Sequence, residues 1–401
     1  MTELTGSDVL AEHSEIIRAA LKRESAKLFA PQESKTERGL RRFSVRETAE
    51  HLKINYNSMR HYLKSVDGIP EGILESGNRR TFSAEEINAI QETLYKAGKI
   101  PLNLYPRKAE GDQTSIIACY NLKGGVAKSS TTSNCATFLA MRGFRVLLVD
   151  IDPQASLSDI FDVRPDIEGF PSIYDVLKYD DPIQMSEAIS GTYVPNIDIV
   201  AGSLNMTEFE FETSATYMSG QHQSTPWHRK ISNALRTVED HYDVIMFDTP
   251  PHMSFAVIAA VFASNAMLIP VSAGMLDIVG LEKFLNLGSN TLSVIEEHEE
   301  GKKYNFVRYL LTRYNKNDPS QLQIGSFLRS ELGSNLLRTD FLHSTALTDA
   351  GIGMQTLLEV DPSKLNRRTY ERIYENLRDI ADELEEEIMK TWGREPVKGG
   401  A

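Results

Sequence analysis

Short apolar runs alternate with longer helical stretches from residue 115 onward. The expected strands are 115–120, 145–150, 197–201, 243–248, 266–271 and 307–312. Each run is apolar at consecutive positions, which is typical of strands buried on both faces of a parallel sheet. A long acidic helix is expected over 366–391. The pattern predicts an α/β fold, with a mostly parallel sheet that carries helices on both faces.

The chain has 401 residues, more than one hydrophobic core usually holds, so several domains are expected. Residues 37–109 carry 13 basic and 9 acidic side chains, although the whole chain has a net charge of −13. Segments 34–41 and 100–113 are polar or rich in Pro and Gly and resemble linkers. The predicted division is a helical segment over 1–36, a small domain over 37–109, the α/β domain over 110–392 and a flexible tail over 393–401.

Residues 7–30 have a helical pattern. Leu10, Ile17, Leu21 and Leu28 fall on a and d positions of a heptad register. Two interpretations remain open: a helix packed on its own chain, or a helix that forms a dimer.

The segment that follows the first expected strand carries the strongest motif. Two adjacent glycines, two lysines and two serines stand between this strand and the next helix, in Lys123-Gly124-Gly125-Val126-Ala127-Lys128-Ser129-Ser130. Backbone N–H groups of such a loop, with a helix N-terminus behind them, form an anion site. Lys128 is predicted to contact the β- and γ-phosphates of a nucleotide, and Ser129 to bind Mg²⁺.

Carboxylates end two further expected strands. Asp150 and Asp152 follow Val146–Val149, and Asp248 follows Val244–Phe247. Ligands of open α/β sheets bind beyond the carboxyl ends of the strands, so these side chains are expected beside the phosphates. Asp248 has the position of a Walker B aspartate and is predicted to lie near Mg²⁺.

Three motifs together resemble the ParA/MinD class of deviant Walker ATPases: NLKGGVAKSS at 121–130, VDIDPQAS at 149–156 and FDTPPHMS at 247–254. Together with the N-terminal module, the chain resembles the larger plasmid partition ATPases, in particular the replication A proteins of repABC-type plasmids. The resemblance covers roughly residues 40–390 and implies the P-loop NTPase fold.

The resemblance also implies roles for individual residues. Lys123 reaches the nucleotide of the partner subunit in an ATP-sandwich homodimer, and Asp152 positions the attacking water. Asp150 and Asp248 support Mg²⁺ and the switch regions. Lys123, Lys128 and Asp152 are therefore the expected catalytic residues, with ATP and Mg²⁺ as cofactors. The chain departs from many family members at Ala127, where they have glycine, so altered turnover is expected.

Residues 43–62 fit a helix-turn-helix, in which Ser44 caps the first helix and Glu47 stands at the capping-box spacing. A basic turn with a new helix follows, and the whole resembles a winged, MerR-like DNA-binding domain. Recognition helices present short polar residues to bases and basic residues to phosphates. The expected DNA contacts are Arg46, Asn57, Ser58, Arg60, His61, Arg79 and Arg80. The competing interpretation is a helical protein-interaction domain with solvated arginines.

The family resemblance implies a DNA segregation cycle. ATP-bound dimers coat nucleoid DNA non-specifically, a ParB-type centromere-binding partner stimulates hydrolysis, and the same protein represses its own operon at an operator. Localisation in the cytoplasm, on the nucleoid, is expected. The alternative is a nucleotide-responsive transcription regulator without significant turnover.

Other functions have little support. Cys119 and Cys135 are expected to be buried apolar residues rather than ligands of an iron–sulfur cluster. No basic amphipathic C-terminal helix and no apolar run long enough to span a bilayer occur, so no membrane partner is expected. The basic residues of the C-terminal part have two open interpretations, a non-specific DNA surface or ordinary solvated charges: Arg308, Arg313, Lys316, Arg329, Arg338, Arg367 and Arg368.

Overall fold

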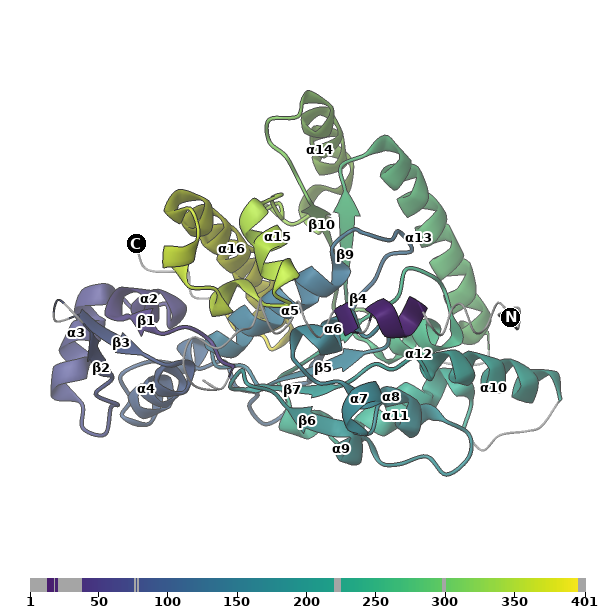
Figure 1. The fold of residues 1–401 in the computed structure, drawn as a ribbon, viewed down its shortest axis with the longest axis horizontal. Helices are drawn as coiled ribbons and strands as arrows, with labels where there is room; N and C mark the ends of the chain where they lie inside the picture. Colours follow the sequence, from purple (N-terminus) through teal and green to yellow (C-terminus); the bar gives the residue numbers. More distant parts are fainter. Residues whose placement is uncertain are drawn as a thin grey trace, which may run out of the picture.

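The computed structural model describes residues 13–17, 19–20, 38–75, 77, 79–219, 225–297 and 301–395. Seven strands of these residues form one sheet in the order β10-β9-β4-β8-β5-β7-β6 (Figure 1). All neighbours pair in parallel except β6, which runs antiparallel to β7. The bounds are β4 Ser115–Cys119, β5 Val146–Asp150, β6 Ile189–Gly191, β7 Ile197–Val200, β8 Val244–Asp248, β9 Ala266–Ser272 and β10 Phe306–Thr312. The predicted α/β fold and all six predicted strands are confirmed; β6 is an additional edge strand.

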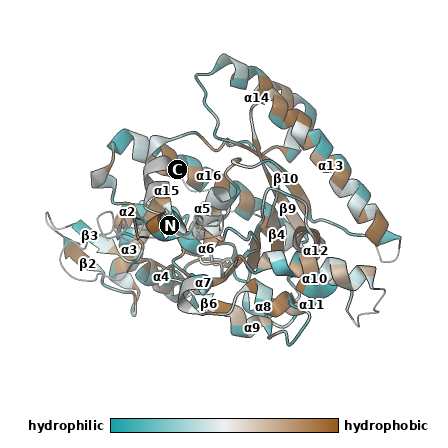
Figure 2. Ribbon diagram, turned by 45° about the vertical axis from the view of Figure 1, so that its right-hand side comes forward, coloured by the Kyte–Doolittle hydropathy of each residue, from teal (hydrophilic) through white to brown (hydrophobic). Residues whose placement is uncertain are grey.

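Both faces of the sheet are buried, as the consecutive apolar runs predict. Alternate residues of one strand enter different cores: Ile117 belongs to one cluster, whereas Ile116 and Ala118 belong to the other. Figure 2 shows β4, β9 and β10 in the hydrophobic colour. The helices complete the two outer layers. Their bounds are α5 Lys128–Met141, α6 Ser156–Ile160, α7 Pro165–Glu168, α8 Ile173–Leu177, α9 Met185–Ala188, α10 Met206–Met218, α11 Lys230–Leu235, α12 Phe255–Ala263, α13 Met275–Glu296, α14 Pro319–Leu332, α15 Thr345–Ile352 and α16 Arg367–Thr391.

Residues 43–96 form a separate set of elements at the opposite end of the molecule from α13 (Figure 1). A three-stranded antiparallel sheet in the order β1-β3-β2 accompanies three helices. The bounds are β1 Phe43–Ser44, α2 Val45–His51, α3 Tyr56–Ser65, β2 Ile73–Glu75, β3 Arg79–Phe82 and α4 Ala84–Lys96. Ser44 and Glu47 form the predicted capping box of α2, and the Asn55 side chain caps α3. We call residues 43–96 the N-terminal module.

The N-terminal module shares a hydrophobic core with the sheet domain. Phe43 and Met59 belong to the same buried cluster as Phe138 of α5 and Ile380 of α16. His51 is fully buried at this junction, where its Nε2 lies 3.0 Å from the Tyr374 hydroxyl. The module is therefore docked on the sheet domain rather than tethered to it.

Arg142 crosses the junction just after α5. It donates hydrogen bonds to the carbonyl oxygens of Glu50 and His51 and to the Asp382 carboxylate of α16, the last at 2.5 Å. Lys53 also pairs with Asp382 and with Glu385. Helix α5, which begins at the phosphate loop, thus ends on the N-terminal module.

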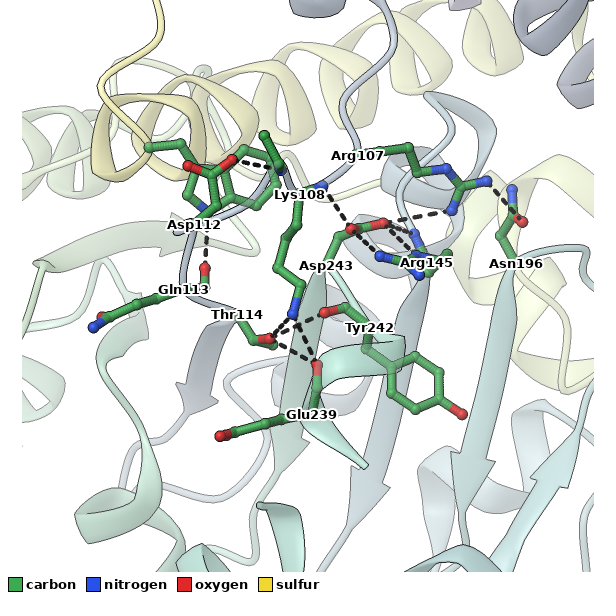
Figure 3. A network of polar contacts seen from close by, with 12 residues as sticks. Arg107, Lys108, Asp112, Gln113, Thr114, Arg145, Asn196, Glu239, Tyr242 and Asp243 are labelled. Carbon is green, nitrogen blue, oxygen red and sulfur yellow. Dashed lines mark hydrogen bonds and ion pairs between the residues drawn. The ribbon is translucent and has the colours of Figure 1, made fainter. Parts of the chain in front are cut away.

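The segment 100–113, predicted as a linker, is anchored at the amino-terminal ends of β4 and β8 (Figure 3). Asp243 is fully buried and accepts from the Lys108 backbone and from the Arg145 guanidinium, both at 2.8–2.9 Å. Arg145 and the surrounding hydrogen bonds keep the pKa of Asp243 below its ordinary value despite burial. At the other end of the chain, Arg394 pairs with Asp112. The Pro and Gly residues of this segment therefore belong to an irregular segment that is anchored to the sheet domain, not to a free linker.

Two predictions fall partly outside the described residues. The heptad register over 7–30 is described only at 13–17 and 19–20, which are helical, and the tail only at 393–395. The predicted domain boundaries stay predictions. No described helix is long and apolar enough to cross a membrane.

Candidate nucleotide-binding site

The glycine loop joins the carboxyl end of β4 to the N-terminus of α5, in the middle of the sheet. Asn121 holds its start, because its side chain donates to the Pro270 carbonyl and accepts from the Lys123 N–H. Gly125 and Ala127 both have a left-handed backbone, with φ of 74° and 64°. These turns bring the chain into the first turn of α5, where free N–H groups favour an anion.

Lys128 lies inside the loop. The residue is 7% exposed, and its Nζ donates to the Lys123 carbonyl at 3.3 Å. Burial lowers its pKa, while the nearby Asp248 and Asp152 carboxylates oppose that shift. The charge is therefore positioned under the loop, next to the predicted Walker B aspartate.

Lys123 lies on the outside of the same loop. Half of its side chain is exposed, and its Nζ pairs with Asp277 in the first turn of α13 at 3.0 Å. Glycines 124 and 125 beside it are exposed as well. The two lysines of the loop thus have different surroundings: Lys128 is enclosed and Lys123 faces outward.

Asp150 and Asp248 stand side by side at the ends of neighbouring parallel strands. Both are fully buried, and burial raises the pKa of each carboxyl, helped by their mutual repulsion in the case of Asp248. Asp150 is already engaged: it accepts from the Ser158 N–H and hydroxyl at 2.9 and 2.7 Å and from the Asp152 N–H. Asp152 itself is half-buried.

The donor set fits a magnesium ion bound together with phosphate. Among described residues, neither carboxylate oxygen of Asp248 has a hydrogen-bond partner, although both are buried. The Ser129 hydroxyl at the start of α5 is close enough to lower the pKa of Asp248. No group of three or more His, Cys, Asp or Glu in the described part of the chain could hold a metal ion alone. Mg²⁺ typically completes its shell with nucleotide phosphates and water, so one carboxylate and one hydroxyl suffice.

The structure adds a residue that sequence reasoning did not place here. Arg313 follows β10, has φ of 52°, and donates to the Gly125 carbonyl at 3.0 Å. It lines two hollows of about 410 and 300 Å³ beside the phosphate loop. His343 lines both hollows, whereas Asp277 lines the first and Ser130 the second. No sequence pattern pointed to this placement, because the contact between Arg313 and Gly125 joins segments that are distant in the sequence.

The predicted DNA-contacting residues lie on the surface of the N-terminal module. Five are exposed, Arg46, Asn57, Arg60, His61 and Arg79, and two are half-buried, Ser58 and Arg80. Met59 between them is fully buried, so α3 presents one polar face.

Most of the C-terminal basic residues are engaged in ion pairs. Arg308 pairs with Glu387, Arg329 with Asp340, Arg338 with Glu383 and Glu386, and Arg367 with Glu371. Their charges are thus partly neutralised within the chain, which favours the interpretation as ordinary surface for these four.

Cys119 and Cys135 are both free and buried. Burial raises the pKa of the Cys135 thiol to about 12. The prediction that both cysteines are buried is confirmed.

Comparison with known proteins identifies the family. Residues 114–299 match the family model described as AAA domain. "Putative replication protein A" of Rhizobium rhizogenes is 33% identical over 96% of this chain and 95% of its own length. The chain belongs to the ParA-type ATPase family.

Other ParA-type relatives match more distantly. Protein SopA of Escherichia coli strain K12 is 26% identical over 80% of this chain and 81% of its own. "Sporulation initiation inhibitor protein Soj" of Bacillus subtilis is 33% identical over 46% of this chain and 66% of its own.

Solved structures show the same fold. The ATP complex of a McdA variant of Cyanothece covers 72% of this chain and all of its own, with a TM-score of 0.55 and 15% identity. A "putative plasmid partition protein" of Borrelia burgdorferi bound to AMPPNP covers 67% of this chain and 98% of its own, with a TM-score of 0.52 and 21% identity. The N-terminal module lies outside the matched AAA domain region.

Proposed function

We propose that this protein is a DNA segregation ATPase that binds ATP and Mg²⁺ as a sandwich dimer. One observation carries the proposal: a single glycine loop holds two lysines, one enclosed and one facing outward. The enclosed Lys128 suits the phosphates of its own subunit. The outward Lys123 suits a phosphate presented by a second subunit, which would give the triphosphate a role in assembly.

Each residue of the site has a separate role in the proposed hydrolysis. The N–H groups of Gly124 to Ser130 cradle the phosphates, and Lys128 balances their charge. Mg²⁺, held by Ser129 and Asp248 with the nucleotide, would add charge neutralisation during phosphoryl transfer. Asp152, at the rim, orients the attacking water. Asp150, bonded to Ser158, holds the segment that carries Asp152.

The two hollows beside Arg313 support binding of a whole nucleotide. The hollow bordered by Ser130 and His343 is continuous with the start of α5, where the phosphates would lie. We assign it to the base and ribose. Arg313 would close over the loop, since its guanidinium already bonds to Gly125.

We assign the N-terminal module to DNA as a winged helix-turn-helix. Its polar α3 face supplies Asn57, Arg60 and His61 for base edges, and the β2–β3 hairpin supplies Arg79 and Arg80 for phosphates. Operator binding by this module would let the protein repress its own operon. Non-specific DNA binding in the ATP state, stimulation by a ParB-type centromere-binding partner and residence on the nucleoid complete the proposed cycle.

The central test uses the two lysines. Lys128→Ala should abolish nucleotide binding. Lys123→Ala should keep binding of ATP to the monomer within a few-fold but lose ATP-dependent dimerisation and turnover, measured by calorimetry, light scattering and phosphate release. Lys283→Ala is the matched control, because Lys283 is an exposed lysine of α13 away from the loop. Dimerisation of Lys123→Ala as tight as wild type would refute the sandwich.

DNA binding is tested separately by point variants, because the module shares its core with the sheet domain. Arg60→Ala should weaken binding to the operator relative to random DNA, by roughly a factor of 10. Arg79→Ala should weaken both equally and reduce the salt dependence. Unchanged operator binding in all of these variants would favour the protein-interaction interpretation of the module.

A transcription regulator without significant turnover is the alternative function. Docking of the N-terminal module on the sheet domain is compatible with this alternative, because bound ATP would then act on the module as an effector without being hydrolysed. Phosphate release with and without DNA and the ParB-type protein separates the two. Absence of turnover under every combination would select the regulator.

A further inference from the structure

An apolar cavity of about 170 Å³ lies between the sheet and helices α12 and α13. Side chains of β9 and β10 form its floor, with Met267, Ile269 and Val307 among them. Val257 of α12 and Phe284 of α13 form its sides. It is separate from the two hollows beside the phosphate loop, since it shares no lining residue with them.

One buried polar group lines this cavity without a partner. Tyr120 is 2% exposed, and its ring meets Phe284 edge-on at 4.9 Å between centroids. Among the residues the structure describes, no atom forms a hydrogen bond with the Tyr120 hydroxyl. A buried donor without an acceptor is costly, so most such groups in proteins have a partner. Burial also raises the pKa of Tyr120, which keeps the hydroxyl protonated as a donor.

The size of the cavity limits its occupant. An engineered apolar cavity of about 150 Å³ stays dry and binds benzene. This cavity is similar in volume and takes one ring with a small substituent. A charged ligand is excluded, because no opposite charge lines the cavity to offset its desolvation.

The cavity has a route to solvent and touches the catalytic loops. Leu285 and Ser289 line it from α13 and are exposed, so a small molecule can enter past this helix. Tyr120 immediately precedes Asn121, which fixes the phosphate loop. Met253, in the segment that links Asp248 to α12, also lines the cavity and accepts a weak hydrogen bond from Thr291.

We propose that this cavity binds a small, uncharged, mainly apolar molecule with one hydrogen-bond acceptor, which takes the Tyr120 O–H. An occupant would contact both the strand before the phosphate loop and the segment after Asp248. It would therefore restrain these segments and slow turnover, a consequence that rests on the proposed ATPase function. The binding site itself does not depend on that function.

The test compares two probes of nearly the same shape, acetophenone and ethylbenzene, which differ by the carbonyl group. Titration calorimetry without nucleotide measures their affinity for the full chain. Wild type should bind both. In Tyr120→Phe the affinity for acetophenone relative to ethylbenzene should fall about fivefold, the effect of one lost hydrogen bond.

A matched pair of glycine substitutions tests the location. Gly288 lines the cavity, and a Cβ added there would meet no atom within 4 Å. Gly280 lies on the same helix with equally open space but does not line the cavity. Gly288→Leu should abolish binding of both probes, whereas Gly280→Leu should bind them as wild type does. Both changes replace a helical glycine by leucine, so a difference between them reports on the cavity.

The outcomes are distinguishable. No binding of either probe to wild type, or an unchanged probe ratio in Tyr120→Phe, overturns the site. Binding that leaves phosphate release unchanged overturns the link to the ATP cycle. Slower phosphate release with acetophenone in wild type, absent in Gly288→Leu, supports both. If neither wild type nor any variant releases phosphate, the proposed ATPase function fails. Calorimetry still shows in that case whether the cavity binds the probes.

Discussion

Lys123 and Lys128 lie five positions apart on one loop, yet their surroundings assign them different partners. Lys128 is enclosed by its own chain, and its neighbours are the carboxylates at the strand ends. Lys123 is half-exposed, and the only described carboxylate paired with it is Asp277. Asp277 neutralises the charge of Lys123 within the monomer. It therefore competes for Lys123 with the phosphate of a nucleotide bound to a second subunit.

Asp277→Asn should therefore favour assembly. Loss of the competing ion pair leaves Lys123 free for the partner's nucleotide. An exposed pair is worth up to about 1 kcal/mol, so the ATP concentration for half-maximal dimerisation should fall by up to about fivefold. Light scattering against ATP concentration measures this, with Asp318→Asn as a control carboxylate at the start of α14. A higher ATP requirement would show that Asp277 serves the dimer instead.

Ala127 carries a conformation that usually belongs to glycine. Its φ of 64° places it in the left-handed region, which costs an alanine roughly 1 kcal/mol. Ala127→Gly should remove this strain and leave nucleotide binding equal or tighter. Ala127→Val should weaken it by roughly a factor of 10 or more, because a β-branched residue is poorly tolerated at positive φ. Calorimetry with ATP and Mg²⁺ compares the three proteins, and equal affinities would mean that the loop rearranges on binding.

At the scale of elements, α5 connects the two parts of the molecule. Its N-terminus begins at Lys128, and the residue after its end, Arg142, bonds to carbonyl oxygens of the N-terminal module and to Asp382 of α16. A shift of α5 on nucleotide binding would therefore move the contacts of α2. Through this placement, the operator binding that we propose would depend on the nucleotide.

Arg142→Ala should destabilise the protein strongly. It leaves two backbone carbonyls without their donor and leaves Asp382 and Glu385 with only Lys53 as a buried partner. Breaking a buried charge network of this kind typically costs about 3–5 kcal/mol. Urea unfolding followed by circular dichroism measures the loss. Arg367→Ala, which removes an exposed pair on α16, is the control and should leave the stability close to that of wild type.

The sequence predicts individual elements better than their contacts. The six predicted strands and the capped helices α2 and α4 follow from local patterns, because runs such as Val146–Val149 and caps such as Ser44 act within a few residues. Edge strand β6 escapes prediction because Ile189–Gly191 is short and carries no apolar alternation. Segment 100–113 resembles a linker because its anchors, Asp243 and Arg394, lie far away in sequence. Arg313 could not be placed at the site for the same reason.

At the scale of the whole molecule, the N-terminal module and the sheet domain share one core. Removal of residues 1–109 would expose Phe138 and Tyr374, which pack against His51. Buried ion pairs also hold the N-terminal module on the sheet domain: Lys53 of the module pairs with Glu385 of α16, and Arg142 after α5 pairs with Asp382. Residues 37–109 carry 13 basic and 9 acidic side chains, although the whole chain has a net charge of −13. Through the shared core, the proposed DNA contacts of the N-terminal module would be mechanically connected to the nucleotide site.

His51 makes this junction sensitive to acid. The side chain is fully buried, and burial together with the charges of Arg142, Arg41 and Arg378 lowers its pKa well below 6.5. In the unfolded chain His51 takes up a proton below pH 6.5, but in the folded protein it stays neutral. Acid therefore favours unfolding, and the stability present above pH 6.5 is lost as the pH falls toward the folded pKa.

His51→Phe should flatten this dependence. The variant keeps an aromatic ring beside Phe43 but loses the contact with the Tyr374 hydroxyl, so it should be less stable at pH 7 by about 1–3 kcal/mol. Urea unfolding at pH 5, 6 and 7 should show a free energy of unfolding that falls less steeply with acid than in wild type. His61→Phe on the exposed face of α3 is the control and should keep the wild-type slope. An equal slope in His51→Phe and wild type would mean that other buried groups, rather than the junction of module and body, set the acid sensitivity.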